Sequence, residues 1–488
     1  MNPRHKKYSV LLTDLYQLTM AYGYWKNQVH EREAVFHVFF RNHPFQSGFS
    51  VACGLADAMD YIREFQIESE EVVYLASLTG SDGKPLFDTE FLEYLRGLIF
   101  TCDIDAIPEG TLVFPQEPLI RVTGPIIQAQ LLETALLNII NFQTLIATKA
   151  ARVCHATGGE PVLEFGLRRA QGIDGGMAAS RAAFIGGCSA TSNVLAGMRY
   201  GIPVKGTHAH SWVMLFDSEE QAFEAYADAM PNNCVFLVDT YDTLEGVHTA
   251  VRVAKRLRAK GHELLGIRLD SGDLAYLSIE ARKILDAGGF PKAQIFASND
   301  LDEYIITSLK QQGARIGLWG VGTKLVTAYD QPAMGGVYKL SAIRGQTGKW
   351  QYRIKLSEQA GKISNPGIHQ VRRFRDGDLY AGDMIYNEGE PIKNDRLIVD
   401  SVDMTRSKKI PAGAMFEDLL VPIFRKGEAV YQSPPIEEIR ARTLKQLARF
   451  HAGIKRFINP HEYPVGLETG LHHLKTELIL KARGTPVE

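Results

Sequence analysis

The chain has 488 residues, of which 45% are hydrophobic and 23% charged, a balance that is ordinary for a soluble globular enzyme of two or three domains. Its 54 Lys and Arg residues and 56 Asp and Glu residues give a formal net charge of −2, which does not support nucleic-acid or membrane-surface binding. The five scattered cysteines form no C-x-x-C pair and indicate free thiols in a reducing cytoplasm.

The first 148 residues mix helical and extended patterns without a regular strand–helix alternation. Helical spacing is expected in 14–25, residues 34–41 alternate like a strand, and prolines divide 110–126 into short strands. A long, mostly buried helix is predicted over 129–153. This part therefore combines helices and strands in one domain.

No targeting or membrane segment is expected. The stretch after the basic N-terminus contains Asp14, Tyr16 and Gln17, which make a poor signal-peptide core. The longest apolar run, 131–147, is interrupted by polar residues and is too short to cross a bilayer. These features predict a cytoplasmic protein with no membrane partner.

From about residue 160, apolar strands alternate with helices. This rhythm predicts βαβ units and a parallel sheet, and the run 234–239 is apolar on both faces, as buried parallel strands are. The predicted strands are 161–166, 202–207, 234–240, 264–272, 293–300 and 314–323, and the predicted helices are 179–201, 243–261, 274–289 and 301–313. After 345 we expect strands and turns, followed by a helix within 434–460.

Each predicted strand ends in a polar or glycine-containing cluster. In a parallel barrel, the C-terminal ends of all strands lie on one face, where the following loops build the active site. The recurrence of arginine, aspartate, histidine and glycine–threonine favours a functional face over the general polarity of loops. The clusters are 165–169, 207–210, 239–242, 268–273, 298–300 and 320–324.

Two of these clusters suit anionic ligands. Gly322 and Thr323 follow a strand, and their backbone N–H groups can converge on a phosphate, although a simple tight turn explains the pattern equally well. No G-x-x-x-x-G-K-[ST] occurs, which disfavours a Walker-type NTPase. Arg268 and Asp270 point the same way if extended and could grip an acid and a diol; a structural ion pair is the alternative.

Two further clusters carry carboxylates and histidines. Asp239, at a strand end, could hold Mg²⁺ directly or through water, whereas Asp242 fits a helix N-cap. His208 and His210 share one face if extended, and with Asp239 and Asp270 they could form the site of a metal-dependent barrel hydrolase. Buried core histidines are another interpretation. Arginines and glycine–threonine at the other strand ends favour phosphate over a bare metal site.

Several long motifs, in order along the chain, make it resemble the nicotinate phosphoribosyltransferase family. The resemblance covers about residues 10–340, with a weaker similarity in YPVGLETGLHHLKTELI. The motifs are TDLYQLTMAYGYW, EFGLRRAQGIDGGMAASRAAFIGG, SNVLAGMRYGIPVKGTHAHSWV, RLDSGDL, GVGTKLVTA and GGVYKL.

The resemblance implies a type II phosphoribosyltransferase fold, an α/β protein working as a homodimer with shared active sites. We expect an N-terminal α/β sandwich domain over 1–148 and an irregular parallel α/β barrel over 149–345. Residues 346–488 would form a C-terminal region that packs on the other two.

The resemblance also implies an activity. Nicotinate and phosphoribosyl pyrophosphate would give nicotinate mononucleotide and pyrophosphate for NAD biosynthesis, with Mg²⁺ and with ATP hydrolysis coupled through a phosphohistidine. By motif, His210 corresponds to the phosphorylated residue, and Thr207 and Arg268 correspond to nicotinate contacts. Thr323 corresponds to the contact with the phosphoribosyl phosphate, and Tyr16 to a tyrosine offered to nicotinate across the dimer.

Further residues match less directly. Phe165 and Arg168 match positions beside the pyridine ring in the related nicotinamide enzyme. The chain departs from the family pattern at Ile173, where proline is expected, and at His208, where other residues are common; neither position has an assigned role.

The chemistry agrees with the resemblance. A flat aromatic acid needs a stacking surface and a cation, which Phe165, Tyr16, Arg168 and Arg268 can provide. Mg²⁺ and cationic groups would stabilise the leaving pyrophosphate, and Asp270 could hold ribose hydroxyls. A nicotinamide- or quinolinate-using phosphoribosyltransferase and a metal-dependent barrel hydrolase remain the alternatives.

Overall fold

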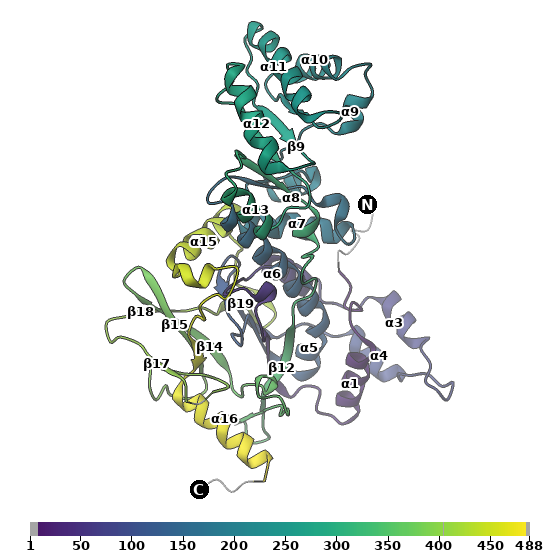
Figure 1. Ribbon diagram of the computed structural model, residues 1–488. Helices are drawn as coiled ribbons and strands as arrows, with labels where there is room; N and C mark the ends of the chain where they lie inside the picture. Colours follow the sequence, from purple (N-terminus) through teal and green to yellow (C-terminus); the bar gives the residue numbers. More distant parts are fainter. Residues whose placement is uncertain (1–7, 404, 485–488) are drawn as a thin grey trace. The chain divides into compact units, whose positions relative to one another are not determined.

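The computed structural model describes residues 8–403 and 405–484, and Figure 1 shows the course of the chain. The chain forms two compact units. Unit 1 comprises the described residues of Met1–Thr144, Ala333–Pro435 and Lys445–Glu488, and unit 2 comprises Leu145–Pro332 and Ile436–Leu444. The predicted domain boundaries at 148 and 345 divide the chain into three continuous stretches, whereas each compact unit combines separate stretches. The two divisions are of different kinds, so the predicted boundaries stay a prediction.

A seven-stranded antiparallel sheet forms the centre of unit 1. Strand β1 (Glu33–Phe40), predicted from its alternation, pairs with β5 (Ile120–Pro125) on one side and β12 (Gly336–Arg344) on the other. The residues of β1 after Glu33 are buried, so both faces of this strand are covered. The strand order is β13 (Trp350–Tyr352), β12, β1, β5, β3 (Asp103–Ala106), β19 (Val421–Arg425) and β20 (Glu428–Ala429).

A second sheet in unit 1 comes from the C-terminal part of the chain, where strands and turns were predicted. Its core contains Phe374, Met384 and Ile398. The strand order is β17 (Ser407–Lys409), β16 (Leu397–Val399), β21 (Val465–Leu467), β15 (Leu379–Asn387), β14 (His369–Asp376) and β18 (Met415–Asp418).

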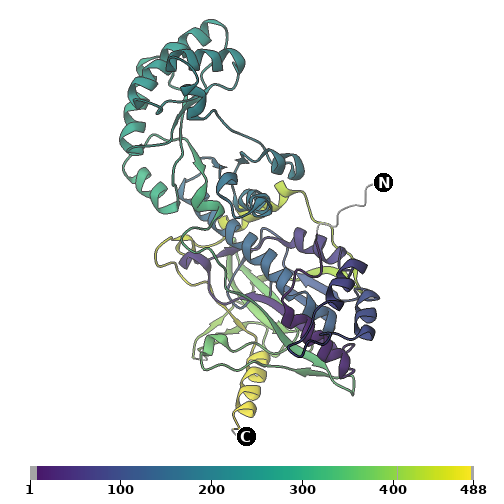
Figure 2. The ribbon, with the colours of Figure 1, turned by 90° about the vertical axis from the view of Figure 1, so that its right-hand side faces the viewer.

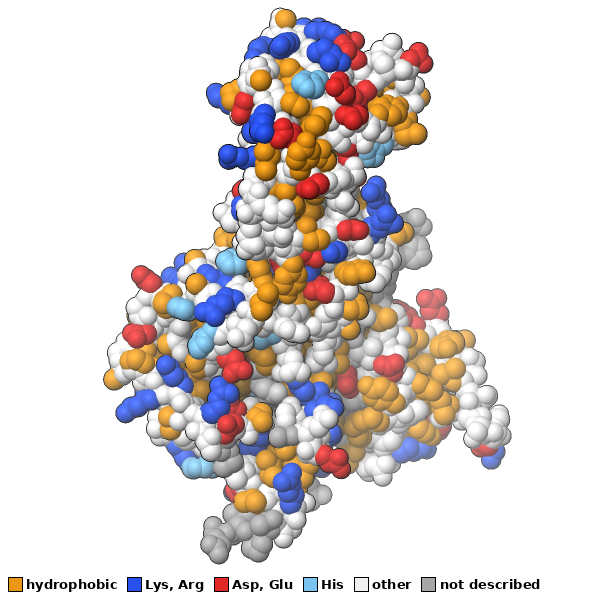
Figure 3. All heavy atoms as spheres, viewed as in Figure 1, with side chains coloured by type: hydrophobic (Ala, Val, Ile, Leu, Met, Phe, Trp, Pro, Cys, Tyr) orange, Lys and Arg blue, Asp and Glu red, His pale blue; other side chains and the backbone are white. Residues whose placement is uncertain are grey.

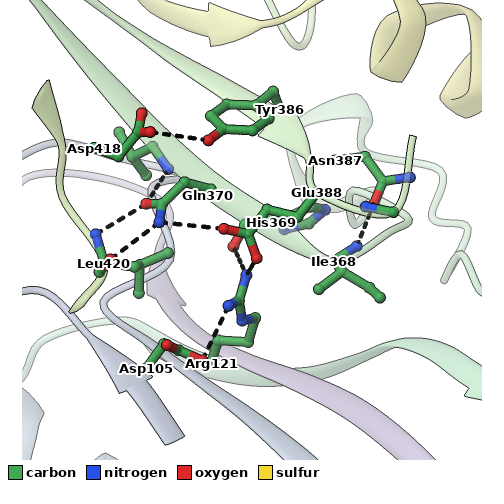
Figure 4. A network of polar contacts seen from close by, with 12 residues as sticks. Asp105, Arg121, Ile368, His369, Gln370, Tyr386, Asn387, Glu388, Asp418 and Leu420 are labelled. Carbon is green, nitrogen blue, oxygen red and sulfur yellow. Dashed lines mark hydrogen bonds and ion pairs between the residues drawn. The ribbon is translucent and has the colours of Figure 1, made fainter. Parts of the chain in front are cut away.

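A largely buried polar network connects the two sheets of unit 1 (Figure 4). Arg121 of β5 donates to Asp105 of β3 and to the backbone oxygen of His369 in β14, each at 2.9 Å, and it also pairs with Glu388. Because a buried charge left without its partner is costly, this network fixes which strands of the two sheets meet.

Two helices of the N-terminal part were predicted, and the structure confirms one of them. Helix α1 (Leu15–Lys26) confirms the helical spacing at 14–25. The single helix predicted over 129–153 is wrong, because α5 (Ile126–Leu131) and α6 (Glu133–Ala156) are separated at Leu132. Leu132 keeps helical backbone angles, so the apolar pattern continues across the break and does not reveal it. The other helices are α2 (Leu55–Arg63), α3 (Ser69–Ala76), α4 (Thr89–Arg96) and α16 (Thr469–Ala482).

Unit 2 contains a six-stranded sheet in which all pairs are parallel, as the strand–helix alternation predicted. The strand order is β7 (Ala190–Thr191), β6 (Val162–Glu164), β11 (Leu318–Val321), β10 (Gln294–Ala297), β9 (Gly266–Leu269) and β8 (Val235–Leu237). All three residues of β8 are buried, which fits a strand covered on both faces.

Helices connect these strands. In Figures 1 and 2, α10 (Glu219–Ala229), α11 (Thr243–Ala259), α12 (Leu274–Ala287) and α13 (Glu303–Gln311) follow one another, each packed against the next. Unit 2 also contains the second half of α6, from Leu145, together with α7 (Ile173–Gly186), α8 (Val194–Tyr200), α9 (His210–Met214), α14 (Thr323–Val326) and the start of α15 (Ile436–Arg449).

The predicted barrel is not confirmed, because the sheet is open: in the described part of the chain, its end strands β7 and β8 do not pair with each other. Two expectations about this edge were also wrong. The helix predicted over 179–201 is divided into α7 and α8 by β7, and the strand predicted over 202–207 is reduced to one bridge between Val204 and Thr191. The edge of the sheet is therefore shorter than the sequence pattern suggested.

The surface carries charges of both signs. On the face that Figure 3 shows, acidic and basic side chains are interspersed with apolar ones. Within 8–403 and 405–484, no helix combines the length and the apolar character that crossing a membrane requires.

Candidate active site

The predicted polar clusters lie at the C-terminal edge of the parallel sheet in unit 2. Phe165 directly follows the end of β6, Gly322 follows β11, and Arg268 is the third residue of β9. Because the C-terminal ends of parallel strands meet at one edge, the loops after these strands face a common region.

Arg268 is the most extensively held side chain of this edge. Its Nη1 donates to Oγ1 of Thr207 at 2.9 Å, its Nε donates to Oγ of Ser298 at 2.8 Å, and its Nη2 donates to Oδ1 of Asp270 at 3.0 Å. The guanidinium carbon lies 5.9 Å from the ring centroid of Phe165. A guanidinium has five N–H donors, so these bonds leave one donor on each terminal nitrogen for a bound acid.

Asp270 is kept in its ionised form by the same group of residues. Burial raises the pKa of its carboxyl group, but a hydrogen bond from Ser298 and the positive charge of Arg268 outweigh burial and hold the pKa below its ordinary value. Ser298 was seen only as part of a strand-end cluster, and sequence reasoning gave it no role. Its position follows from the pairing of β10 with β9, which places the ends of these strands side by side.

Glycines bring the loops after β6 and β11 together. A Cβ atom on Gly320 would lie 2.9 Å from the ring of Phe165, and one on Gly322 would lie 3.0 Å from the backbone oxygen of Phe165. Side chains at these positions would push Phe165 away from Arg268. Thr323 then begins α14, which has only four residues, and the next residue, Lys324, pairs with Asp302 at 2.7 Å.

His210 is the first residue of α9 and lies among acidic and hydroxyl groups. Its Nε2 is 3.9 Å from Oδ1 of Asp239 and 3.8 Å from Oδ2 of Asp270, while its Nδ1 is 3.1 Å from Oγ1 of Thr240. The side chain is 39% exposed, so a ligand can reach the ring. Thr240 was not singled out from the sequence, although it lies between the predicted site residues Asp239 and Asp242.

Asp239 is almost completely buried, with 1% of its side chain exposed. Its Oδ2 accepts hydrogen bonds from the backbone N–H of Asp270 at 2.9 Å and from Oγ of Ser271 at 2.6 Å. Its buried Oδ1 has no hydrogen-bond partner in the described part of the chain. Asp242 caps α11 by accepting from the N–H of Glu245 at 3.0 Å, which confirms the cap interpretation.

His208 and His210 are not oriented as a joint pair of metal ligands. His208 is buried, and its Nε2 accepts the backbone N–H of Leu237 at 3.2 Å, whereas His210 faces the two aspartates. Within the described residues, no group of three or more His, Cys, Asp or Glu side chains is arranged to hold a metal ion. The two histidines therefore have separate environments.

Glu219 is a carboxyl group near this site that sequence reasoning missed. Burial, together with the negative charges of Asp239 and Asp242, raises its pKa to about 7. Its Oε1 is buried and has no hydrogen-bond partner in the described part of the chain. The sequence held no signal for it, because an acidic residue in the first turn of a helix is common.

Two further residues, Arg168 and Tyr16, were also predicted to belong to the site. Arg168 lies in the short helical turn Leu167–Arg169 after β6 and is exposed. Tyr16 lies on α1 in unit 1, apart in sequence from the strand ends, and is 48% exposed. Its proposed contact with nicotinate stays a prediction.

Family models match most of the chain. Three family models match in order: the nicotinate phosphoribosyltransferase N-terminal domain over 11–141, the nicotinate phosphoribosyltransferase family over 162–351, and the nicotinate phosphoribosyltransferase C-terminal domain over 368–475.

Similar proteins cover nearly the full length. The chain is 48% identical to the nicotinate phosphoribosyltransferase of Bacillus subtilis, over 94% of this chain and 92% of that protein. It is 34% identical to the human nicotinate phosphoribosyltransferase, over 96% of each chain. The crystal structure of human nicotinic acid phosphoribosyltransferase matches with a TM-score of 0.83 over 96% of this chain and 99% of the other, at 33% identity. The chain therefore belongs to the nicotinate phosphoribosyltransferase family.

Proposed function

We propose that this chain transfers the phosphoribosyl group of phosphoribosyl pyrophosphate to nicotinate, giving nicotinate mononucleotide and pyrophosphate for NAD biosynthesis. The observation that carries the proposal is the arginine at the end of β9. Arg268 is held by Thr207, Ser298 and Asp270 and keeps one N–H on each terminal nitrogen. A nicotinate carboxylate can accept both donors, with its ring near Phe165.

The preference for an acid over an amide follows from this geometry. Asp270 already neutralises part of the charge of Arg268, and a bound carboxylate would complete the pairing. Nicotinamide has no negative charge, so it would leave the partly buried guanidinium less well compensated. Quinolinate carries a second carboxylate, for which exposed Arg168 is the candidate partner at this edge.

The transfer step needs little chemistry from the protein beyond positioning and charge. The ring nitrogen of nicotinate forms a bond to the anomeric carbon of ribose as the bond to pyrophosphate breaks, and the electron pair leaves with pyrophosphate. Asp270 can accept ribose hydroxyl groups, and Gly322 and Thr323 can donate to the 5′-phosphate. Exposed Arg168 can attract the anionic substrate.

Asp239 fits a Mg²⁺ ion. Its Oδ1 is a hard oxygen ligand with no hydrogen-bond partner among the described residues, and Mg²⁺ is usually held by one or two carboxylates together with substrate phosphates. When bound, the ion would neutralise negative charge on pyrophosphate or on the phosphates of ATP.

We also propose that His210 accepts the γ-phosphoryl group of ATP. The carboxylates of Asp239 and Asp270 only accept hydrogen bonds, so they favour a proton on the facing Nε2. Nδ1 then carries the lone pair and accepts the hydroxyl hydrogen of Thr240. When that hydroxyl turns away, Nδ1 can attack the γ-phosphorus as the bond to ADP breaks, and ADP leaves with the electron pair. Water later attacks the phosphorus, and phosphate leaves the ring.

Three further parts of the proposal concern the whole molecule. A homodimer with shared active sites would allow Tyr16 of one subunit to reach the nicotinate of the other. The open sheet would act as an irregular barrel whose gap is spanned by residues 205–208. A reducing cytoplasm is supported by the five cysteines, none of which forms a disulfide within the described residues.

The transferase proposal is tested by measuring product formation from phosphoribosyl pyrophosphate with nicotinate, nicotinamide or quinolinate in parallel. We expect nicotinate mononucleotide to be the main product by a wide margin. Equal turnover of nicotinamide would contradict the role of Arg268.

The phosphohistidine proposal is tested by incubating the protein with γ-labelled ATP and Mg²⁺ and then treating it with acid or base. The label should be acid-labile and base-stable, and it should be absent in His210→Ala. ATP should no longer stimulate His210→Asn, although slow transfer persists because the contacts to both substrates remain. Label retained in His210→Ala would show that another residue is phosphorylated.

A further inference from the structure

Strand β8 ends the parallel sheet, and the donor groups on its outer edge need partners. In the described part of the chain, β8 pairs with β9, to which Val238 donates at 3.2 Å. Leu237, one residue earlier, directs its backbone N–H to the opposite edge, as alternation along a strand requires. There Nε2 of His208 accepts this N–H at 3.2 Å. An imidazole thus occupies the place of a neighbouring strand.

The ring of His208 is held in place from several directions. It is 8% exposed and lies edge-to-face against Tyr226 of α10, with ring centroids 4.8 Å apart. Phe223 of the same helix stacks on Phe236 of β8, with ring centroids 4.6 Å apart. The helix that packs against His208 therefore also packs against the strand that His208 contacts. Burial lowers the pKa of His208 to about 4, so its ring is neutral at pH 7 and Nε2 can accept a hydrogen bond.

The contact with β8 lies just before the start of α9. Ala209 is extended and serves as the N-cap residue of α9, and His210 is the first residue of the helix. Farther along α9, Nε1 of Trp212 donates to the backbone oxygen of Ala222 in α10 at 3.0 Å. The segment that carries His210 is therefore fastened on both sides, by His208 before it and by Trp212 after it.

Thr207, which belongs to the proposed nicotinate site, is held by a separate hydrogen bond. Thr207 accepts a hydrogen bond from Arg268 at 2.9 Å, and this bond does not involve His208. Losing the contact between His208 and β8 should thus affect the position of His210 more than that of Thr207.

We propose that His208 is a positioning residue for His210: its hydrogen bond to the edge of β8 fixes the start of α9 and holds the His210 ring between Thr240 and the two aspartates for phosphoryl transfer. The inference rests on the proposed phosphohistidine. It assigns a separate function to each of the two neighbouring histidines, one structural and one reactive.

Two substitutions in the full-length protein separate the hydrogen bond from the shape of the ring. His208→Gln keeps an acceptor at about the reach of Nε2, whereas His208→Phe keeps the ring against Tyr226 and removes the acceptor. His262→Phe is the matched control, because His262 is a partly exposed residue of unit 2 whose Nδ1 contacts Oδ1 of Asn232. The measurements are the initial rate of labelling from γ-labelled ATP with Mg²⁺ and the KM for nicotinate without ATP.

We expect His208→Phe to slow labelling at least about tenfold, the effect of leaving one buried donor unpaired. His208→Gln and the control should label at close to the wild-type rate, and the KM for nicotinate should change much less than the labelling rate. If His208→Phe does not fold, His208→Asn replaces it, because its shorter side chain cannot reach Leu237; the same slowing is expected.

Several results would overturn the inference. Labelling of His208→Phe at the wild-type rate, or equal slowing in the Gln and Phe variants, would remove the role of the hydrogen bond. A rise in the KM for nicotinate as large as the loss in labelling would indicate general disruption of the site. If the wild-type protein takes no label, the phosphohistidine proposal and the positioning role of His208 are both wrong. If the wild type is labelled and the variants give the results above, only the positioning role is wrong.

Discussion

The hydroxyl oxygen of Thr240 lies 3.1 Å from Nδ1 of His210, whereas the carboxylates of Asp239 and Asp270 face Nε2 of the same ring. The two nitrogens of this histidine therefore meet opposite requirements. One faces acceptors and retains the proton, and the other accepts a hydrogen bond and has a lone pair. This difference makes the hydroxyl of Thr240 a direct test of which nitrogen reacts.

Thr240→Val keeps the shape of the side chain and removes the hydroxyl. We expect phosphorylation of His210 to slow roughly fivefold, because one hydrogen bond of about 1 kcal/mol no longer orients the ring. Thr240→Ser should restore most of the rate. The initial rate of labelling from γ-labelled ATP measures this effect, and equal rates in the valine and serine variants would show that the hydroxyl has no part in it.

Arg268→Ala should weaken catalysis with nicotinate far more than catalysis with nicotinamide. Arg268 is partly buried, so we expect a cost near the lower end of the range for broken buried charge pairs, about 2 kcal/mol, and kcat/KM for nicotinate should fall roughly 30-fold. Parallel kinetics with both bases measure the change in preference. The control is Arg258→Ala, which removes an exposed pair with Glu263. An unchanged ratio of kcat/KM for the two bases would contradict carboxylate recognition by Arg268.

Shared active sites predict complementation between two inactive variants. Subunits with Tyr16→Ala and subunits with His210→Ala should each have low ATP-stimulated activity, and mixed dimers should regain part of it, because one composite site in a mixed dimer contains both intact residues. The measurement is activity after the two variants are unfolded and refolded together, compared with each variant refolded alone. No gain on mixing, or a fully active wild-type monomer, would argue against sharing.

The stability of the protein should depend on pH through His208. Its pKa is about 4 in the folded chain against an ordinary value of 6.5, mainly because of burial. On acidification the unfolded chain binds the proton first, so the free energy of unfolding should fall between about pH 6.5 and 4, with this contribution fully present above that range. Buried histidines elsewhere, such as His37 and His369, act in the same direction.

The comparison with His208→Gln isolates the contribution of one histidine. The variant has no titrating group at this position, so its unfolding free energy should decrease less steeply as the pH falls. Urea unfolding of both proteins at several pH values from 7.5 to 5 measures the two slopes. Identical slopes would mean that His208 has the same pKa in the folded and unfolded chains.

The parallel sheet of unit 2 and its polar edge could be predicted from the sequence, because both depend on local patterns. The run 235–238 is apolar on both faces, and the polar residues Asp239 and Thr240 follow it directly. The open sheet could not be predicted in this way. Strand β7 has only two residues, Ala190 and Thr191, which are too few to show an alternating pattern in the sequence.

The hydrogen-bond partners of the site residues could not be predicted from the sequence either. Ser298 reaches Arg268 because β10 lies beside β9, and strand order is a property of the fold. The directions in which the two histidine rings point depend on the local backbone conformation. An extended segment would have put both rings on one face, but α9 begins at His210, and His208 faces β8 instead. Motif matches selected His210, and only the geometry gave His208 a role.

Helix α15 has a consequence for how this protein can be divided. Its first nine residues, Ile436–Leu444, belong to unit 2, although they lie more than one hundred residues beyond Pro332 in sequence. Arg440 of this helix donates to the backbone oxygens of Gly187 and Cys188, at 2.8 and 3.0 Å, just after α7. A fragment ending near residue 345 would retain the strand-end cluster but leave these oxygens without their donor. The unit that carries the candidate site thus cannot be expressed as one continuous stretch, and a ribosome must finish almost the whole chain before that unit can be complete.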